Sequence, residues 1–198
     1  MNVAMKIAES FVPAFLKKRQ LKKLFALAAG VFKSEAPSIA GLSFEESLRV
    51  FADYTQRETV TAIKRGEDLN VIKWKLFKGA YEIGDRLRKF LHVTDTGDIM
   101  KAGRLIYGTL GINFLGTPRG EVTINKCFFS EIYSARTCRV ISSLDEGMMA
   151  GLSHGGAFMF SQRMTEGFDS CRANFIPKGT SDEKSYRSGH RCWWCNCC

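Results

Sequence analysis

Hydrophobic positions in the first half of the chain recur every three or four residues, which is the period of an amphipathic α-helix. Ser43 and Glu46 form a capping-box pattern, which marks the start of a helix. The first predicted helix is strongly basic and contains no long uncharged run. Helices are expected over approximately 1–34, 43–65, 71–91 and 94–110.

The second half of the chain shows both the strand period of two and the helix period of 3.6. Alternation over 121–129 predicts a strand with Val122 and Ile124 on one face and Cys127 on the other, more polar face. The remaining elements are expected at roughly 133–152 for a central helix, and at 157–166 and 170–176 for a hairpin. The predicted fold class is α+β, with the N-terminal helices packed on a small antiparallel sheet and a central helix nearby.

The chain of 198 residues is long enough to bury a sizeable core in one domain. We expect a basic amphipathic helix over 1–34, an α+β domain over 43–178 and a cysteine-rich tail over 179–198. A ligand pocket is expected within 121–176, because the residues able to do chemistry gather there.

Four of those residues are predicted to meet if the sheet packs on the central helix: Cys127, Cys138, Asp145 and Cys171. Asp145 falls in the apolar stripe of the helix, where an unpaired carboxylate is costly. The carboxyl group therefore either has a perturbed pKa in a functional site or lies at the stripe's edge, satisfied by a backbone group or an arginine.

His154 and Arg163 are the candidate substrate-binding residues. His154 follows the central helix and is the histidine placed to reach the pocket, although a histidine beside two glycines also suits a turn. Arg163 or Arg172 could hold a carboxylate by paired hydrogen bonds, or each could be an exposed strand residue.

The cysteines, the acid and the hairpin resemble the L-2-amino-thiazoline-4-carboxylic acid hydrolase-like family. The resemblance spans Asn113 to Lys178, and Gly167, Asp169 and Cys171 match the family's closing hairpin. It implies an α+β domain with a ligand pocket and hydrolytic opening of a cyclic amidine-like thiazoline ring. A similar hairpin occurs in 4-vinyl reductase-type domains, which implies instead a non-catalytic module that binds an apolar or tetrapyrrole-like molecule.

Two chemical routes would open such a ring. A thiolate of Cys127 or Cys171 could attack the amidine carbon, or a base could activate water. Asp145 is then either the base or the anchor for the amidinium group. In the binding module, several phenylalanines would line the cavity or else form the core: Phe128, Phe129, Phe158, Phe160 and Phe175.

Charge and cysteine content indicate the partners and the compartment. The net charge of +9 favours an anionic partner, and the sequence has no nucleic-acid-binding motif, so a small anionic or apolar ligand is preferred over nucleic acid. The stripe within 11–32 suits packing on its own domain, on a second copy in a homo-oligomer, or on an anionic membrane surface.

The seven cysteines and the absence of a convincing signal peptide favour a reducing cytoplasm. A C-x-x-C step near the C-terminus suits either a metal or cluster site or an oxidation-prone extension, and the sequence assigns no cofactor. The four cysteines of this tail are Cys192, Cys195, Cys197 and Cys198.

Overall fold

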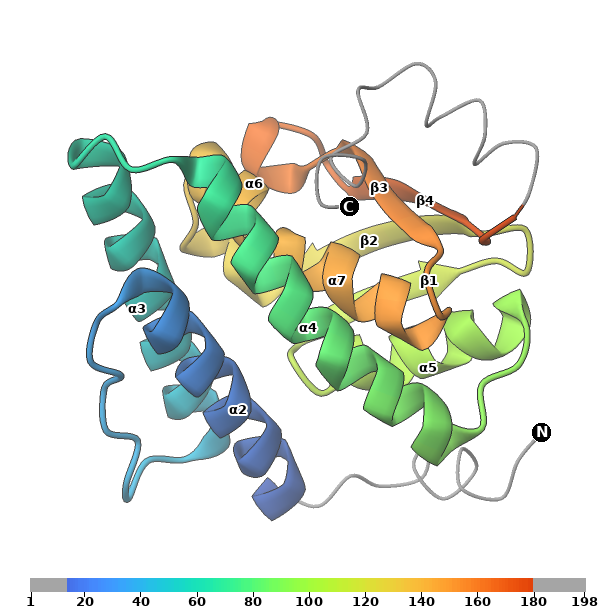
Figure 1. Ribbon diagram of the computed structural model, residues 1–198, viewed down its shortest axis with the longest axis horizontal. Coiled ribbons are helices and arrows are strands. Elements are labelled where there is room, and N and C mark those ends of the chain that lie inside the picture. Colours follow the sequence, from blue (N-terminus) through green and yellow to red (C-terminus); the bar gives the residue numbers. More distant parts are fainter. Residues whose placement is uncertain (1–13, 180–198) are drawn as a thin grey trace.

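The computed structural model describes residues 14–179 and confirms the α+β fold class (Figure 1). The helices are α2 (Ala14–Phe32), α3 (Phe44–Lys64), α4 (Leu69–Leu91), α5 (Thr96–Gly108), η1 (Phe128–Glu131), α6 (Ala135–Ile141), α7 (Ser143–Leu152) and η2 (Met164–Glu166). The strands are β1 (Ile112–Gly116), β2 (Glu121–Cys127), β3 (Ala157–Gln162) and β4 (Cys171–Ile176).

One antiparallel sheet with the strand order β1-β2-β4-β3 forms one layer of the molecule. Its inner face packs against α5 and α7, and α4 covers the other side of α7 (Figure 1). The predicted strand over 170–176 is present as β4, in which Cys171, Ala173 and Phe175 are buried while the residues between them are exposed. The helix α7 is therefore enclosed between the sheet and α4.

Two β-bulges change the faces of residues at the end of β2 and β3. In β2, Ile124 pairs with Phe114 while Lys126 pairs with Asn113, so Asn125 is an extra residue. The bulge returns Cys127 to the inner face, opposite the buried Ile112. The prediction that Cys127 lies on the face opposite Val122 is wrong for this reason.

The second bulge lies in β3, where Phe160 pairs with Ala173 and Gln162 pairs with Arg172, leaving Ser161 unpaired and exposed. Because of this extra residue, the chain reaches Arg163 with its side chain directed inward, where it is only 14% exposed.

Glycines allow α4 and α7 to approach very closely. A Cβ atom built on Gly147 would lie 2.2 Å from the carbonyl oxygen of Phe77, and one on Gly151 would lie 2.2 Å from that of Tyr81. From the opposite side, a Cβ atom on Gly84 would lie 2.3 Å from the carbonyl oxygen of Met148. Larger residues at these three positions would force the helices apart.

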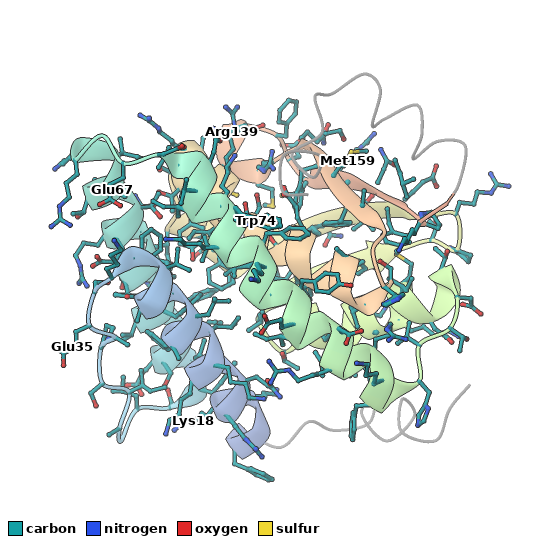
Figure 2. All side chains as sticks on the ribbon, in the orientation of Figure 1. Lys18, Glu35, Glu67, Trp74, Arg139 and Met159 are labelled. Carbon is teal, nitrogen blue, oxygen red and sulfur yellow. The ribbon has the colours of Figure 1, made fainter. Side chains whose placement is uncertain are left out.

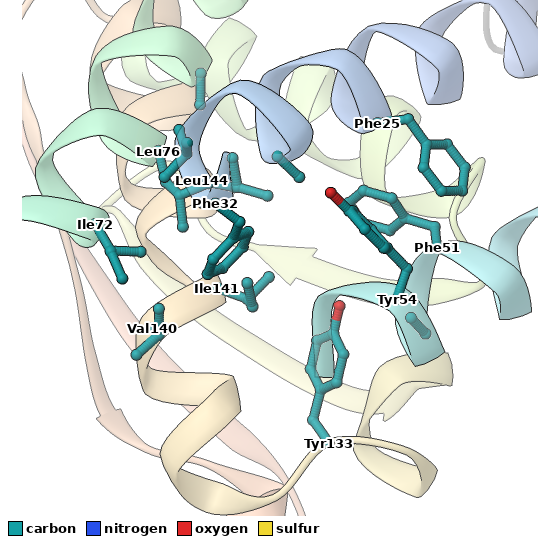
Figure 3. Close-up of a cluster of buried hydrophobic side chains, with 14 of the residues drawn as sticks. Phe25, Phe32, Phe51, Tyr54, Ile72, Leu76, Tyr133, Val140, Ile141 and Leu144 are labelled. Atoms are coloured by element: carbon teal, nitrogen blue, oxygen red, sulfur yellow. The ribbon is translucent and has the colours of Figure 1, made fainter. Parts of the chain in front are cut away.

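Apart from the core between the sheet, α5 and α7, a hydrophobic cluster lies between α2, α3, α4 and α6 (Figure 3). The apolar stripe of α2 is buried in it, including Leu21, Phe25 and Phe32. Tyr133 closes the cluster and bonds through its hydroxyl group to Thr55 at 2.7 Å. The stripe of α2 is therefore used for packing on its own domain.

The helix ends follow the sequence signals closely. The predicted capping box is present: the Ser43 N–H donates to the Glu46 carboxylate at 2.6 Å, and the Glu46 N–H donates to the Ser43 hydroxyl at 3.2 Å. The residues preceding 14 in the predicted first helix lie outside the described part. No helix among residues 14–179 is long and apolar enough to cross a membrane.

Three element predictions for the second half are corrected, and one strand is added. The central helix is divided at Ser142 into α6 and α7. The first predicted strand ends at Cys127, and the predicted strand 157–166 ends at Gln162, since a short 3₁₀ helix follows each. Strand β1 was not predicted from the sequence.

Candidate functional site

The candidate site is centred on Asp145, in the first turn of α7. Its carboxyl group acts electrostatically on the thiols of Cys127 on β2, Cys138 on α6 and Cys171 on β4. The structure therefore brings together the four residues for which the sequence predicted a common site.

The environment of Asp145 changes its protonation. Burial raises its pKa to about 7, against the opposing effects of the Tyr107 hydroxyl and the Arg163 guanidinium; the neighbouring Glu146 raises the pKa further. The side chain retains some accessible surface. Both the carboxylate and the carboxylic acid are therefore populated near neutral pH, as general acid–base chemistry requires.

Tyr107, on α5, faces Asp145 and was not predicted as a site residue. It is only 3% exposed, and its ring stacks on Phe114 with centroids 5.1 Å apart and planes 4° from parallel. Burial raises the pKa of the phenol well above its ordinary value, and Asp145 raises it further. The hydroxyl group influences Asp145 but lacks a hydrogen bond of good geometry. The position of Asp145 in an apolar stripe indicated that its carboxyl group has a polar partner, but it did not identify that partner as Tyr107.

Glu146 is a second carboxyl group that sequence analysis missed. Burial raises its pKa to about 7, while Lys73 on α4 and Arg163 oppose the rise. Two adjacent acids with perturbed pKa values thus begin α7, one directed toward Tyr107 and the other influenced by Lys73.

Arg163 is held next to these acids by weak contacts. Its Nη2 donates to the Ser142 hydroxyl at 3.3 Å, its Nη1 lies 3.7 Å from a Glu166 oxygen, and its guanidinium lies 4.7 Å from the Phe160 ring centroid. Glu166 is bound more closely by Arg139, at 2.7 Å, and Arg139 is 60% exposed at the edge of the molecule (Figure 2).

Buried polar atoms without a partner are concentrated in this cluster. Among residues 14–179 there are four such side-chain atoms, and three are Tyr107 Oη, Arg163 Nε and Thr165 Oγ1; the fourth is in Thr59. Buried polar groups are normally hydrogen-bonded, because an unmade bond costs about 1–3 kcal/mol. Tyr107 and Arg163 both act on Asp145, and Thr165 lies beside Cys138. Such atoms around one titrating carboxyl group indicate a site that is not optimised for stability alone.

The three thiols are neutral. Burial raises the pKa of Cys127 to about 12, and it also raises the pKa values of Cys138 and Cys171. Cys171 accepts a hydrogen bond from the Met164 N–H at 3.3 Å. Since the thiolate is the reactive form of cysteine, these groups are poor nucleophiles at neutral pH.

His154 is not brought to the cluster. It follows α7 with a φ of 57°, is 69% exposed, and has Nδ1 3.9 Å from a carboxylate oxygen of Asp85. It lies nine residues beyond Asp145, which corresponds to about 14 Å along a helix. Arg172 is exposed on the outer face of β4. Of the two predicted carboxylate anchors, only Arg163 reaches the site.

The phenylalanines considered as cavity lining take part in packing. Phe158 and Phe175 are buried in the core beneath the sheet, and Phe160 packs against the same core. Phe129 stacks on Tyr133, and Phe128 meets Phe129 edge to face.

No group of three or more His, Cys, Asp or Glu side chains within the described residues is arranged to hold a metal ion. The cysteines of the C-terminal tail lie outside that part of the chain. The sequence matches no protein-family model, and a search of curated proteins finds no match.

Proposed function

We propose that the Asp145 cluster is the active site of a hydrolase that opens a small cyclic amidine, of the thiazoline carboxylate type. The observation that carries the proposal is the position of Asp145: a buried carboxyl group next to the Tyr107 hydroxyl, with three neutral thiols and an arginine around it. The resemblance noted in the sequence supplies the substrate class.

The reaction consumes one water molecule. The water oxygen bonds to the amidine carbon of the ring, which becomes tetrahedral, and the bond from that carbon to the ring sulfur then breaks. The electron pair of this bond goes to sulfur, which takes up a proton. The product of 2-amino-thiazoline-4-carboxylate is a carbamoyl-cysteine with a free thiol.

Asp145 supplies both proton transfers in this scheme. As the carboxylate it accepts a proton from the attacking water, and as the carboxylic acid it returns that proton to the departing sulfur. A pKa of about 7 suits both steps at neutral pH. The Tyr107 hydroxyl, protonated because its pKa is raised, can donate a hydrogen bond to the group that gains negative charge.

Water is a better nucleophile for this site than Cys127. A thiol whose pKa is about 12 carries almost no thiolate at pH 7, whereas a half-ionised carboxyl group can activate water. The three uncharged thiols then help to exclude water from the carboxyl group of Asp145, which keeps its pKa raised.

The test is incubation of the full chain with 2-amino-thiazoline-4-carboxylate, followed by mass spectrometry for a product heavier by one water. We expect turnover by the wild type and by the surface control Glu131→Gln, and a loss of about 100-fold or more in Asp145→Asn. Cys127→Ser should retain turnover. No product from the wild type, or full activity in Asp145→Asn, would overturn the proposal, and loss in Cys127→Ser would overturn the water mechanism.

A further inference from the structure

Two of the unpartnered buried atoms belong to one short segment, Arg163–Glu166, which follows β3. They are Arg163 Nε and Thr165 Oγ1. Each is a hydrogen-bond donor, and each is fixed by the local fold. The bulge at Ser161 turns Arg163 inward, and the 3₁₀ turn of η2 brings the Thr165 hydroxyl to the Cys138 thiol, whose sulfur is only a weak acceptor for it. Buried donors that lack a strong acceptor within the chain favour an acceptor from outside it.

The charges around Arg163 are not balanced by a dedicated partner. Glu166 is shared by two arginines, and its shorter contact, 2.7 Å, is with Arg139 rather than the 3.7 Å contact with Arg163. Asp145 and Glu146 both interact electrostatically with the Arg163 guanidinium, yet burial keeps each carboxyl group largely protonated below about pH 7. In mildly acidic solution the segment therefore carries an excess positive charge.

The size of this excess limits the ligand. One guanidinium with one free nitrogen donor and one hydroxyl matches the two oxygens of a carboxylate. A doubly charged phosphate would lie beside Asp145 and Glu146, whose ionisation it would oppose more strongly. A monocarboxylate fits both the donors and the charge.

We propose that Arg163 Nε and Thr165 Oγ1 form a buried subsite for the carboxylate of a small ligand, next to Asp145. The role of this subsite in catalysis rests on the proposed function. The subsite would hold the carboxylate end of the substrate, so that the ring faces Asp145 and Tyr107. It also defines a ligand class that applies whether or not turnover occurs.

Binding to this subsite depends on pH through the groups that surround Arg163. Ionisation of Asp145 or Glu146 adds negative charge beside the bound carboxylate, so affinity falls as pH rises through about 7. The thiols of Cys138 and Cys171 stay neutral over this range, because burial raises their pKa values. The titratable and charged groups around it are Asp145, Glu146, Cys138, Arg139, Glu166 and Cys171, with Lys73 beyond Glu146.

The test compares two probes that differ only in the carboxylate: 2-oxothiazolidine-4-carboxylate and thiazolidin-2-one. Calorimetric titration of the full chain should give an affinity about tenfold or more higher for the carboxylate probe at about pH 6. Arg163→Met should abolish this preference, and Thr165→Val should reduce it severalfold. Arg172→Met, which changes an exposed arginine of β4, is the matched control and should keep the preference.

Arg163→Lys keeps the positive charge but lacks the guanidinium nitrogens, so it should bind the carboxylate probe with a preference between those of the wild type and Arg163→Met. Binding by this variant would show that the loss in Arg163→Met is not a folding defect. Equal affinity for the two probes, binding of neither, or an unchanged preference in Arg163→Met would overturn the subsite. The same titration in Asp145→Asn separates the two proposals. If the protein prefers the carboxylate probe but no variant turns over the thiazoline, the carboxylate subsite is supported and the hydrolase proposal is refuted. If the protein turns over the thiazoline but shows no preference for the carboxylate probe, the hydrolase proposal is supported and the subsite is refuted.

Discussion

Replacing Asp145 with asparagine should stabilise the protein while it abolishes turnover. Burial raises the pKa of this carboxyl group from the ordinary 3.8 to about 7. Between those two values the folded state holds a proton that the unfolded state has lost, so the free energy of unfolding falls as pH rises from about 4 to about 7. The difference in pKa corresponds to roughly 4 kcal/mol at pH values above 7, at about 1.36 kcal/mol per pKa unit. Asparagine has nearly the same shape and no charge, and it removes this cost.

The assay is urea unfolding of the wild type and of Asp145→Asn at about pH 5 and about pH 8. At about pH 5 the carboxyl group is protonated in the folded state, and the expected gain is only roughly 1–2 kcal/mol. The gain should be larger by roughly 2–3 kcal/mol at about pH 8. Glu146 is present in both proteins, so its own pH dependence largely cancels in the comparison. Glu131→Gln, a change at an exposed carboxylate, controls for the loss of one surface charge and should show no such trend.

The contrary result is equally clear. If Asp145→Asn destabilises the protein by a similar amount at both pH values, the carboxylate is ionised and structurally paired in the folded state. The reasoning that assigns it an acid–base role would then fail.

Three further predictions concern the scaffold. Gly147→Ala should destabilise the protein by a few kcal/mol in thermal unfolding, because its Cβ would lie 2.2 Å from the Phe77 carbonyl oxygen. The control Gly30→Ala, in open space on α2, should stabilise the protein by up to about 1 kcal/mol. Equal effects of the two substitutions would show that α4 and α7 can separate freely. Ser43→Ala should cost about 1 kcal/mol through loss of the capping box, and an unchanged melting temperature would show that the box does not stabilise α3. Iodoacetamide at about pH 8 should modify Cys127 much more slowly in the native than in the urea-unfolded protein, as followed by peptide mass spectrometry, because its pKa is about 12; equal rates would indicate an exposed thiol.

The helices were predictable because their signals are local. A stripe of apolar positions at a period of 3.6 was enough to place α3 and α4, and the Ser43–Glu46 capping box marked the first residue of α3. The period of two likewise predicted a strand over 170–176, where the structure has β4. Each of these signals lies within a few residues of the element it specifies.

The site was predicted in part, and the failures share a physical cause. A β-bulge adds one residue and exchanges the two faces of a strand, and its only mark in the sequence is a one-residue shift in the phase of the alternation. Cys127 was therefore assigned to the wrong face, and the sequence left open whether Arg163 points inward or is exposed. Tyr107 and Glu146 were missed because their roles depend on contacts between α5, α7 and α4, which only the folded arrangement defines.

Ser142 illustrates the same limit. As one continuous helix, 133–152 would have carried its stripe from Cys138 to Leu152 along a single side. The structure divides that segment at Ser142, so that Cys138 contributes from α6 while Asp145 begins α7. The hydroxyl of Ser142 then accepts a hydrogen bond from Arg163, and the division becomes part of the site.

The most direct test of the central claim, that Asp145 is the acid–base group of a hydrolytic site, is the pH dependence of kcat for 2-amino-thiazoline-4-carboxylate at saturating concentration. We predict that kcat rises with pH through a pKa at or above about 7, since the carboxylate form activates water and a bound anion raises this pKa further. A kcat that stays constant or falls from about pH 5 to about pH 8, or the absence of any turnover, would contradict the claim.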